Sequence, residues 1–121
     1  MTRATPKRDR QVTVLAYLAQ SLPSDAVVWA TPNGQKRSRY ERTEFKALGG
    51  VAGAPDLFIA LSGNVYGIEL KAPKKKPSLA QLTLFVRLGI AGIPVGICHS
   101  VEDVEKYLCR WEVPLKAKVA A

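Results

Sequence analysis

The chain has 121 residues, of which 47% are hydrophobic and 23% are charged. This length fits one domain with a single hydrophobic core, and the composition excludes an intrinsically disordered protein. Eighteen Lys and Arg against ten Asp and Glu give a formal net charge of +8, which indicates an anionic partner such as nucleic acid. The charge alone does not decide the partner, because a basic surface also keeps a protein in solution.

We expect a cytoplasmic protein that contacts no membrane. No apolar signal-peptide core follows the basic residues 1–10, and no segment approaches the ~18 consecutive apolar residues that a membrane span needs. The two cysteines, Cys98 and Cys109, lack the Cys-x-x-Cys spacing of zinc sites. We therefore expect free thiols in a reducing compartment.

The first half of the chain predicts a helix, a strand and a short helix. Thr5-Pro6 favours a helix start, and the apolar spacing predicts a helix over residues 7–21. Residues 26–30 are a short β-favouring run, and residues 35–40 are expected to form an exposed basic loop. A second helix is expected over residues 41–48, before Gly49-Gly50. The expected apolar stripe of the first helix is Val12, Leu15, Ala19 and Leu22, with Val14 and Leu18 alongside.

The second half predicts a β-hairpin followed by a helix, a strand and a helix. Residues 56–61 and 65–71 are β-favouring runs joined by a glycine-containing turn. Ser78 opens a helix that ends near Gly92, residues 94–98 read as a strand buried on both faces, and residues 101–111 as a helix. The expected apolar stripe of the first of these helices is Leu79, Leu82, Phe85, Val86 and Gly89.

This order, α-β-α-β-β-α-β-α, predicts an α/β fold with a mixed central β-sheet flanked by helices. We expect a single domain over residues 1–121, with its core at about residues 7–111. The tail, residues 114–121, is expected to be weakly ordered.

Three ionisable residues of the hairpin form the strongest functional signal. Pro55 has no N–H and suits the head of a strand, where it places Asp56 at the end of the sheet. The period of two puts Glu69 and Lys71 on one face, with Gly67 leaving room beside them and the alternating apolar residues facing the core. Two converging carboxylates suit Mg²⁺ or Mn²⁺, so the pattern predicts a metal-dependent site for phosphate chemistry.

Each part of this pattern also has a plain structural explanation, since a Pro-Asp pair is usually a turn and a Glu-x-Lys pair usually faces solvent. Two other functions stay open. The first is a non-catalytic basic nucleic-acid-binding module. The second is an interaction subunit in which the same charged residues form a buried ion-pair network. A pure binder has no evident use for two carboxylates near its phosphate partner, because they repel it unless a cation intervenes.

Three segments resemble the VRR-NUC family, a branch of the PD-(D/E)xK nuclease superfamily. They are residues 49–57 (GGVAGAPDL), 68–73 (IELKAP) and 78–81 (SLAQ), and the likeness extends over about residues 33–107. The resemblance implies a restriction-endonuclease-like core and a Mg²⁺- or Mn²⁺-dependent DNA endonuclease, with junctions or flaps as one open substrate class. The segment at residues 33–38 is similar to that of phage-type standalone members, which implies a phage-encoded protein that acts in the host cell.

The resemblance also implies roles for individual residues. Asp56 and Glu69 would bind the metal together with the main-chain carbonyl of Leu70. Lys71 would orient or deprotonate the attacking water. Gln81 would lie beside the site, although the same glutamine also completes a capping box with the serine three residues earlier.

The first helix departs from the family pattern. The family usually has a glutamate shortly before a glutamine, whereas this chain has Arg8-Asp9-Arg10-Gln11. Asp9 would either replace the glutamate as a metal ligand or be a solvated residue that the helix dipole favours. The number of metal ions therefore stays open.

Two basic clusters are candidates for DNA contact. Lys36 and Arg37 lie in the expected loop, and Lys74, Lys75 and Lys76 follow the second hairpin strand. Such residues bind backbone phosphates, although a charge run is equally typical of solvated surface.

We expect a homodimer, because one small domain with one site cannot cut both strands of a duplex without dissociating or turning round. The resemblance points the same way, and two-fold closure is the commonest oligomer symmetry. The expected interface consists of apolar groups outside the predicted core stripes: Tyr40, Phe45, Trp111 and residues 113–115.

Overall fold

The structure is a computed structural model that describes residues 5–31 and 38–116. Its elements follow the expected order, and each overlaps the residue range predicted for it. The helices and strands are α1 (Pro6–Ser21), β1 (Val27–Ala30), α2 (Arg39–Ala47), β2 (Leu57–Leu61), β3 (Asn64–Leu70), α3 (Leu79–Ile90), β4 (Val95–Cys98) and α4 (Val101–Arg110). Helix α2 takes in Arg39 and Tyr40 from the expected basic loop, because Ser38 caps it with a complete capping box.

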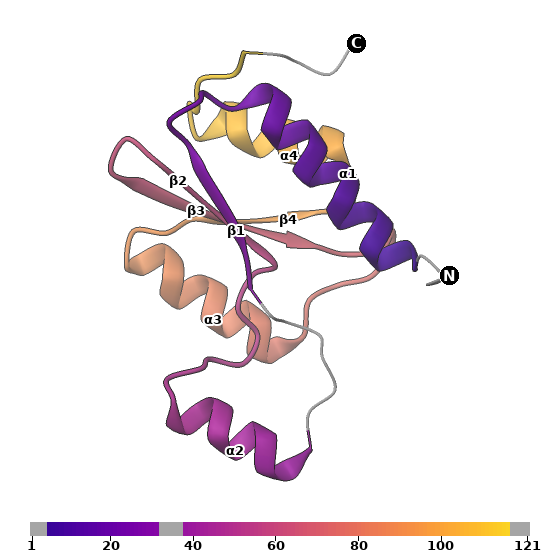
Figure 1. Cartoon of the computed structure of the whole chain (residues 1–121), viewed down its shortest axis with the longest axis vertical. Coiled ribbons are helices and arrows are strands. Elements are labelled where there is room, and N and C mark those ends of the chain that lie inside the picture. The colour runs from indigo at the N-terminus through magenta and orange to yellow at the C-terminus, as the bar shows by residue number, and fades with distance from the viewer. Residues whose placement is uncertain (1–4, 32–37, 117–121) are drawn as a thin grey trace.

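One mixed sheet of four strands, in the order β1-β2-β3-β4, forms the centre of the molecule (Figure 1). The pairs β1–β2 and β2–β3 are antiparallel, and β4 runs parallel to β3. Ser62 and Gly63, the two residues between β2 and β3, have φ of 52° and 82°, as a tight hairpin turn requires. The predicted hairpin is confirmed, and α3 supplies the crossover that the parallel pair needs.

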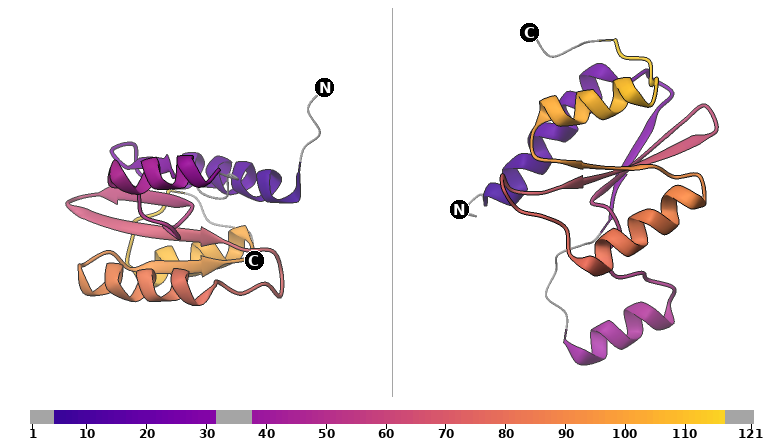
Figure 2. Two further views of the ribbon diagram at one scale, coloured as in Figure 1. Left: turned by 90° about the horizontal axis from the view of Figure 1, so that it is seen from below. Right: turned by 180° about the vertical axis from the view of Figure 1, so that it is seen from behind.

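Helices cover both faces of this sheet. Helices α1 and α4 lie together on one face, α3 lies on the other, and α2 stands beyond α3 (Figures 1 and 2). The main core fills the space between the sheet and the α1–α4 pair. Its buried residues are Val14, Leu18, Leu22, Leu57, Ile59, Leu61, Ile68, Leu70, Cys98, Val104, Leu108 and Val113.

The buried stripe of α1 differs from the expected one. Val14 and Leu18 are buried, whereas Val12 is 48% exposed. Residues four apart on a helix share a face, so the stripe begins one turn before Val14, at Arg10. A cation therefore occupies the first position of a stripe that otherwise faces the core.

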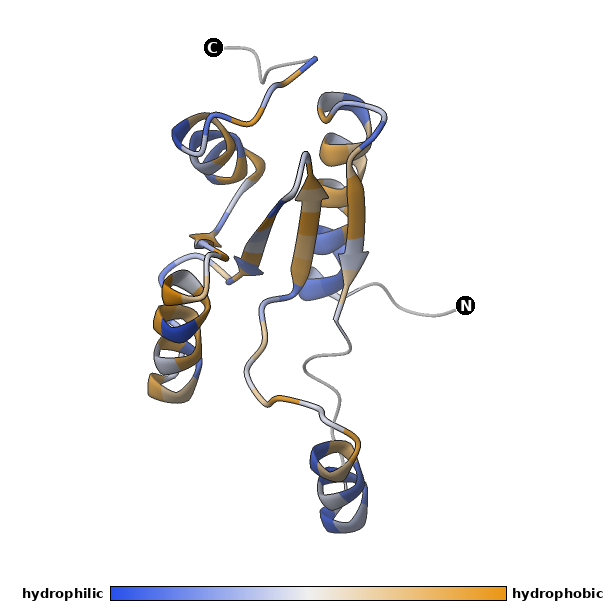
Figure 3. Ribbon diagram, turned by 90° about the vertical axis from the view of Figure 1, so that its left-hand side faces the viewer, coloured by the Kyte–Doolittle hydropathy of each residue, from blue (hydrophilic) through white to orange (hydrophobic). Residues whose placement is uncertain are grey.

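The apolar residues of α3 form a helix, as predicted, but most of the predicted apolar stripe does not face the core. Of its large side chains only Phe85 is buried, while Leu79, Val86 and Ile90 are 81%, 63% and 83% exposed. Figure 3 shows this helix as mainly orange, in contrast to the bluer α2. The reason is that α3 contacts the sheet mainly at the edge strand β4, whose Val95 and Ile97 are consequently only half-buried.

Several residues expected at a dimer interface belong to the core instead. Val113 is buried, and Trp111 and Leu115 pack against the same core. The core thus reaches past residue 111 into the expected weakly ordered tail, of which residues 117–121 lie outside the described residues. Phe45 closely covers Gly50, whereas Tyr40, 72% exposed, and Pro114 keep the predicted accessibility. Within the described ranges, no helix combines the length and apolar character that a membrane span requires.

The two thiols should react very differently with an alkylating agent. Cys98 is buried in β4, and burial raises the pKa of its thiol to about 12, whereas Cys109 is exposed on α4. Because the thiolate is the reactive form, we expect N-ethylmaleimide to label only Cys109 in the folded protein. Mass spectrometry should find one adduct before denaturation and two after it; rapid double labelling of the folded protein would contradict the burial of Cys98.

Candidate active site

The register of the hairpin brings Asp56 and Glu69 together. Leu57 pairs with Ile68, so continuing the register by one residue places Asp56 opposite Glu69. Oδ2 of Asp56 accepts a hydrogen bond of 2.8 Å from the main-chain N–H of Leu70. Asp56 is 5% exposed and Glu69 is 3% exposed, although carboxylates are seldom buried without a partner.

The strand ends around these carboxylates are held by main-chain contacts. Thr31, which follows β1, donates its N–H to the carbonyl of Asp56 over 2.9 Å and its hydroxyl to the carbonyl of Pro55. A Cβ on Gly67 would lie 3.1 Å from both the Pro55 ring and Val95. Gly67 thus leaves room, as expected, and that room is filled by the side chains of Pro55 and Val95.

Two side chains contact the same oxygen of Glu69. Nζ of Lys71 lies 3.3 Å from Oε2 of Glu69, and Nε2 of Gln81 donates to that oxygen over 3.0 Å. The side-chain amide oxygen of Gln81, Oε1, accepts a hydrogen bond of 2.9 Å from the main-chain N–H of Ser78. Gln81 thus makes both contacts weighed for it, since its oxygen completes the capping box and its nitrogen reaches the site.

Burial strongly affects the ionisation of Glu69. Burial and, to a smaller extent, the negative charge of Asp56 raise the pKa of this carboxyl, Lys71 partly offsets them, and the net pKa is about 7. A cation near the two carboxylates would favour the ionised form. The described residues alone therefore do not provide enough positive charge to keep both carboxylates ionised at neutral pH.

An unpartnered oxygen supports a metal at this position. Oε1 of Glu69 is buried and has no hydrogen-bond partner among the described residues. Residues 5–31 and 38–116 contain no group of three or more His, Cys, Asp or Glu side chains that would hold a metal unaided. Mg²⁺ binds through one or two carboxylates plus water and substrate phosphate, so the Asp56–Glu69 pair fits such an ion and does not resemble a structural zinc site.

The carboxylates open into a cavity of about 380 Å³ whose rim is basic. Its lining includes five cationic side chains: Lys7, Arg10, Lys71, Lys75 and Lys76. Two members of the predicted basic cluster thus reach the cavity, whereas Lys74 is not in its lining. Lys36 and Arg37 lie outside the described residues.

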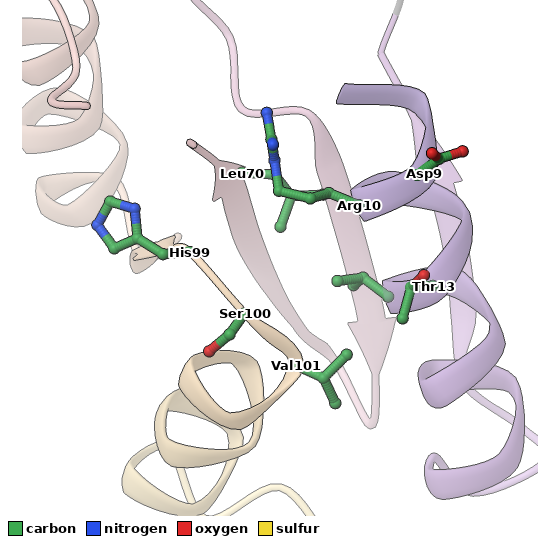
Figure 4. A pocket seen from close by; sticks show the side chains of 8 residues that line it. Asp9, Arg10, Thr13, Leu70, His99, Ser100 and Val101 are labelled. Atoms are coloured by element: carbon green, nitrogen blue, oxygen red, sulfur yellow. The ribbon is translucent and has the colours of Figure 1, made fainter. Parts of the chain in front are cut away.

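The structure does not bring Asp9 to the two carboxylates. Asp9 is exposed and lines a neighbouring cavity of about 220 Å³ beside His99 (Figure 4). One residue corresponds to about 100° of rotation around a helix, so Arg10, not Asp9, turns toward the carboxylates. Asp9 is thus not in the lining of the cavity that holds Asp56 and Glu69, and its role as a metal ligand stays a prediction.

His99 was overlooked as a support of the strand end. Its Nδ1 lies 3.2 Å from the carbonyl of Lys71 and 3.1 Å from that of Ala72, which assigns the proton to Nδ1. The Lys71 N–H donates to the carbonyl of Cys98 over 2.9 Å. The backbone of Lys71 is thus fixed from β4 where the chain leaves the sheet, and nothing in the local sequence signals this contact.

Comparison with known proteins identifies the fold. No protein-family model matches the sequence, and a search of curated proteins also finds no match. A solved structure named "VRR_NUC domain protein" superposes with a TM-score of 0.71 at 18% identity, covering 91% of this chain and 90% of its own. A second, named "VRR_NUC domain", has a TM-score of 0.57 at 25% identity, with 88% and 97% covered. A phage origin is not addressed by either name and stays a prediction. The chain has the mixed α/β, restriction-endonuclease-like fold of VRR-NUC domains.

Proposed function

We propose that the protein is a nuclease that hydrolyses phosphodiester bonds in DNA with the help of Mg²⁺ or Mn²⁺. One observation carries the proposal: two buried carboxylates, one with an unpartnered oxygen, lie beside Lys71 in a cavity with a basic rim. The carboxylates suit a hard cation, and the rim suits the phosphates of the substrate. The names of the structurally similar proteins support nuclease activity in general.

The residues of the site would divide the work. Asp56 and Glu69 hold the cation, and the carbonyl of Leu70 is proposed as a further oxygen ligand. When bound, the ion lowers the pKa of water and neutralises charge on the phosphate. Lys71 places a fixed positive charge, with three N–H donors, where it can orient the attacking water and stabilise developing negative charge. Gln81 keeps the Glu69 carboxylate in one orientation, because it contacts Oε2 and leaves Oε1 available.

A cleavage panel tests this function. Linear, nicked, flap, single-stranded and four-way-junction DNA should be incubated with the protein in Mg²⁺, Mn²⁺ or EDTA. We expect cleavage of at least one substrate in either metal and none in EDTA. Metal-independent cleavage, or no cleavage of any DNA, would contradict the proposal.

A non-catalytic nucleic-acid-binding module remains the alternative. The basic rim is compatible with it, but the two buried carboxylates are not used in it and would repel phosphate. Calorimetric titration with Mn²⁺ separates the two functions, since only the nuclease needs a divalent ion. Binding of DNA that is equally tight with and without metal, and never followed by cleavage, would favour the module.

Binding of duplex DNA should weaken steeply with salt. For a protein that neutralises Z phosphates, log K falls with log salt with a slope of about −0.9Z. Lys75 and Lys76 line the cavity and Lys74 does not, so we expect alanine at either of the first two positions to reduce the slope more than Lys74→Ala. Fluorescence anisotropy over a salt series measures this; three equal slopes would indicate that the cluster acts as diffuse charge.

We also propose a homodimer, now with a different candidate interface. Helix α3 leaves Leu79, Val86 and Ile90 largely uncovered, and these replace the C-terminal residues that pack in the core. Sedimentation equilibrium at micromolar concentration, with and without a four-way junction, should give twice the 13.2 kDa of one chain. A monomer under both conditions would refute the dimer. Val86→Lys should lower the dimer fraction, since a charge on this stripe would be buried by association.

A further inference from the structure

Arg10 is the arginine in the lining of the cavity that holds the two carboxylates; the other cationic residues in that lining are lysines. Its side chain lines both the cavity of about 380 Å³ that holds Asp56 and Glu69 and the neighbouring one of about 220 Å³. Leu70 is the other residue shared by the two cavities. In Figure 4 the Arg10 side chain leaves α1 toward the strand end that carries Leu70, whereas the Asp9 carboxylate points away from it.

The guanidinium of Arg10 has no protein partner among the residues that the structure describes. Its Nε is buried without a hydrogen-bond partner, and within residues 5–31 and 38–116 the side chain forms no hydrogen bond or salt bridge. A buried donor that lacks a partner typically costs about 1–3 kcal/mol. Asp9 does not relieve it, because adjacent residues on a helix do not face each other.

Among the described residues, Arg10 forms no ion pair with either nearby carboxylate, and the unpartnered Oε1 of Glu69 is the oxygen assigned above to the proposed metal. Asp56 accepts from the main chain of Leu70, and Glu69 is contacted by Lys71 and Gln81. The guanidinium, half-buried at the cavity, is therefore free to bind an anion that enters from outside. Since four lysines line the same cavity, a ligand with several negative charges in a row fits better than a single carboxylate.

We infer that Arg10 binds a backbone phosphate of the nucleic-acid strand that occupies the active-site cavity. The inference rests on the proposed nuclease function and adds a residue to it. A planar guanidinium forms two parallel hydrogen bonds to phosphate, which a lysine does not. Arg10 thus positions the strand from the α1 side while the two carboxylates act from the sheet side.

Three variants at Arg10 and one control test this role. Arg10→Met keeps the stem without the charge, Arg10→Lys keeps the charge without the fork, and Arg10→Ala removes both. Arg8→Met is the matched control, because Arg8 is exposed on the same helix and lines neither cavity. Since Arg10 has no partner to lose among the described residues, Arg10→Met should melt at the same temperature as the parent protein or higher. A clearly lower melting temperature would assign Arg10 a structural role and overturn the inference.

Binding is measured with a fluorescein-labelled DNA duplex in EDTA, so that cleavage does not contribute. We expect Arg10→Met to lower the log–log salt slope by ~0.9, the value for one lost phosphate contact, and Arg8→Met to lower it by clearly less. Cleavage in Mn²⁺ should fall by ~10²-fold for Arg10→Ala, as for loss of a preorganised charge, with Arg10→Lys intermediate.

The two readouts separate this inference from the proposed function. If the parent protein does not cleave DNA but Arg10→Met still loses one phosphate contact, the nuclease proposal fails and the phosphate site stands. If the parent protein cleaves and the Arg10 variants bind and cleave as Arg8→Met does, the nuclease stands and the inference is overturned.

Discussion

Replacing Lys71 with alanine should lower the rate of DNA cleavage by ~10²-fold or more, the loss expected when a preorganised charge stabiliser is removed. DNA affinity should change little, because Lys71 is one of eighteen Lys and Arg in a chain with a net charge of +8. The difference arises from position. Nζ of Lys71 lies 3.3 Å from the carboxylate of Glu69, and Lys71 lines the cavity of the two carboxylates, so its charge acts locally.

Single-turnover cleavage and fluorescence anisotropy on the same DNA measure the two quantities. Lys74→Ala is the matched control, since Lys74 carries the same charge three residues later but is not in the cavity lining. We expect this control to cleave at nearly the parent rate. Near-normal cleavage by Lys71→Ala would remove this lysine from the catalytic centre.

The centre of this site could be predicted because hairpin pairing follows local rules. A two-residue turn fixes the register, and the register places Asp56 opposite Glu69. Alternation along β3 then puts Ile68 and Leu70 in the core and Glu69 on the opposite face. No information beyond the hairpin was needed for these placements.

Helix faces were predicted less well, because they depend on tertiary packing. In α1 several overlapping stripes are compatible with the sequence, and only contact with the sheet selects Val14 and Leu18 over Val12. Arg10 lies four residues before Val14, so it is a cation on the buried face of the helix. In α3 the apolar residues outnumber those that the sheet covers, so periodicity alone could not predict their exposure.

Dual roles are also difficult to predict from sequence. Gln81 was expected either to cap α3 or to reach the site, and it does both through its two amide atoms. The contact of His99 with the carbonyls of Lys71 and Ala72 joins residues 28 and 27 positions apart. Such contacts depend on the parallel pairing of β3 with β4, which no local pattern specifies.

The second large effect concerns the two carboxylates. Asp56→Asn and Glu69→Gln should each weaken Mn²⁺ binding by more than the ~10- to 100-fold typical of losing an outer-shell partner. An amide keeps the shape of the side chain but removes the charge that a hard cation requires. Calorimetric titration measures the affinity, with Glu102→Gln, the same change at an exposed position of α4, as control. Unchanged affinity in both variants would place any metal elsewhere.

Stability should respond to Glu69→Gln with opposite signs in the two metal states. Burial raises the pKa of Glu69 from 4.5 to about 7, so the folded protein holds a proton that the unfolded chain releases in this range. The contribution of Glu69 to stability is thus fully present below pH 4.5 and is lost as the pH rises to about 7. At pH 8 without metal, the glutamine variant should be more stable than the parent by on the order of 1–3 kcal/mol. Mn²⁺ at a concentration that saturates the parent should reverse the order, because the parent binds the ion more tightly and so gains more free energy on folding. Urea denaturation at pH 4 and pH 8, with EDTA or Mn²⁺, measures the free energy of unfolding and tests both signs. A glutamine variant that is less stable than the parent in EDTA at pH 8 would show that ionised Glu69 does not destabilise the metal-free protein.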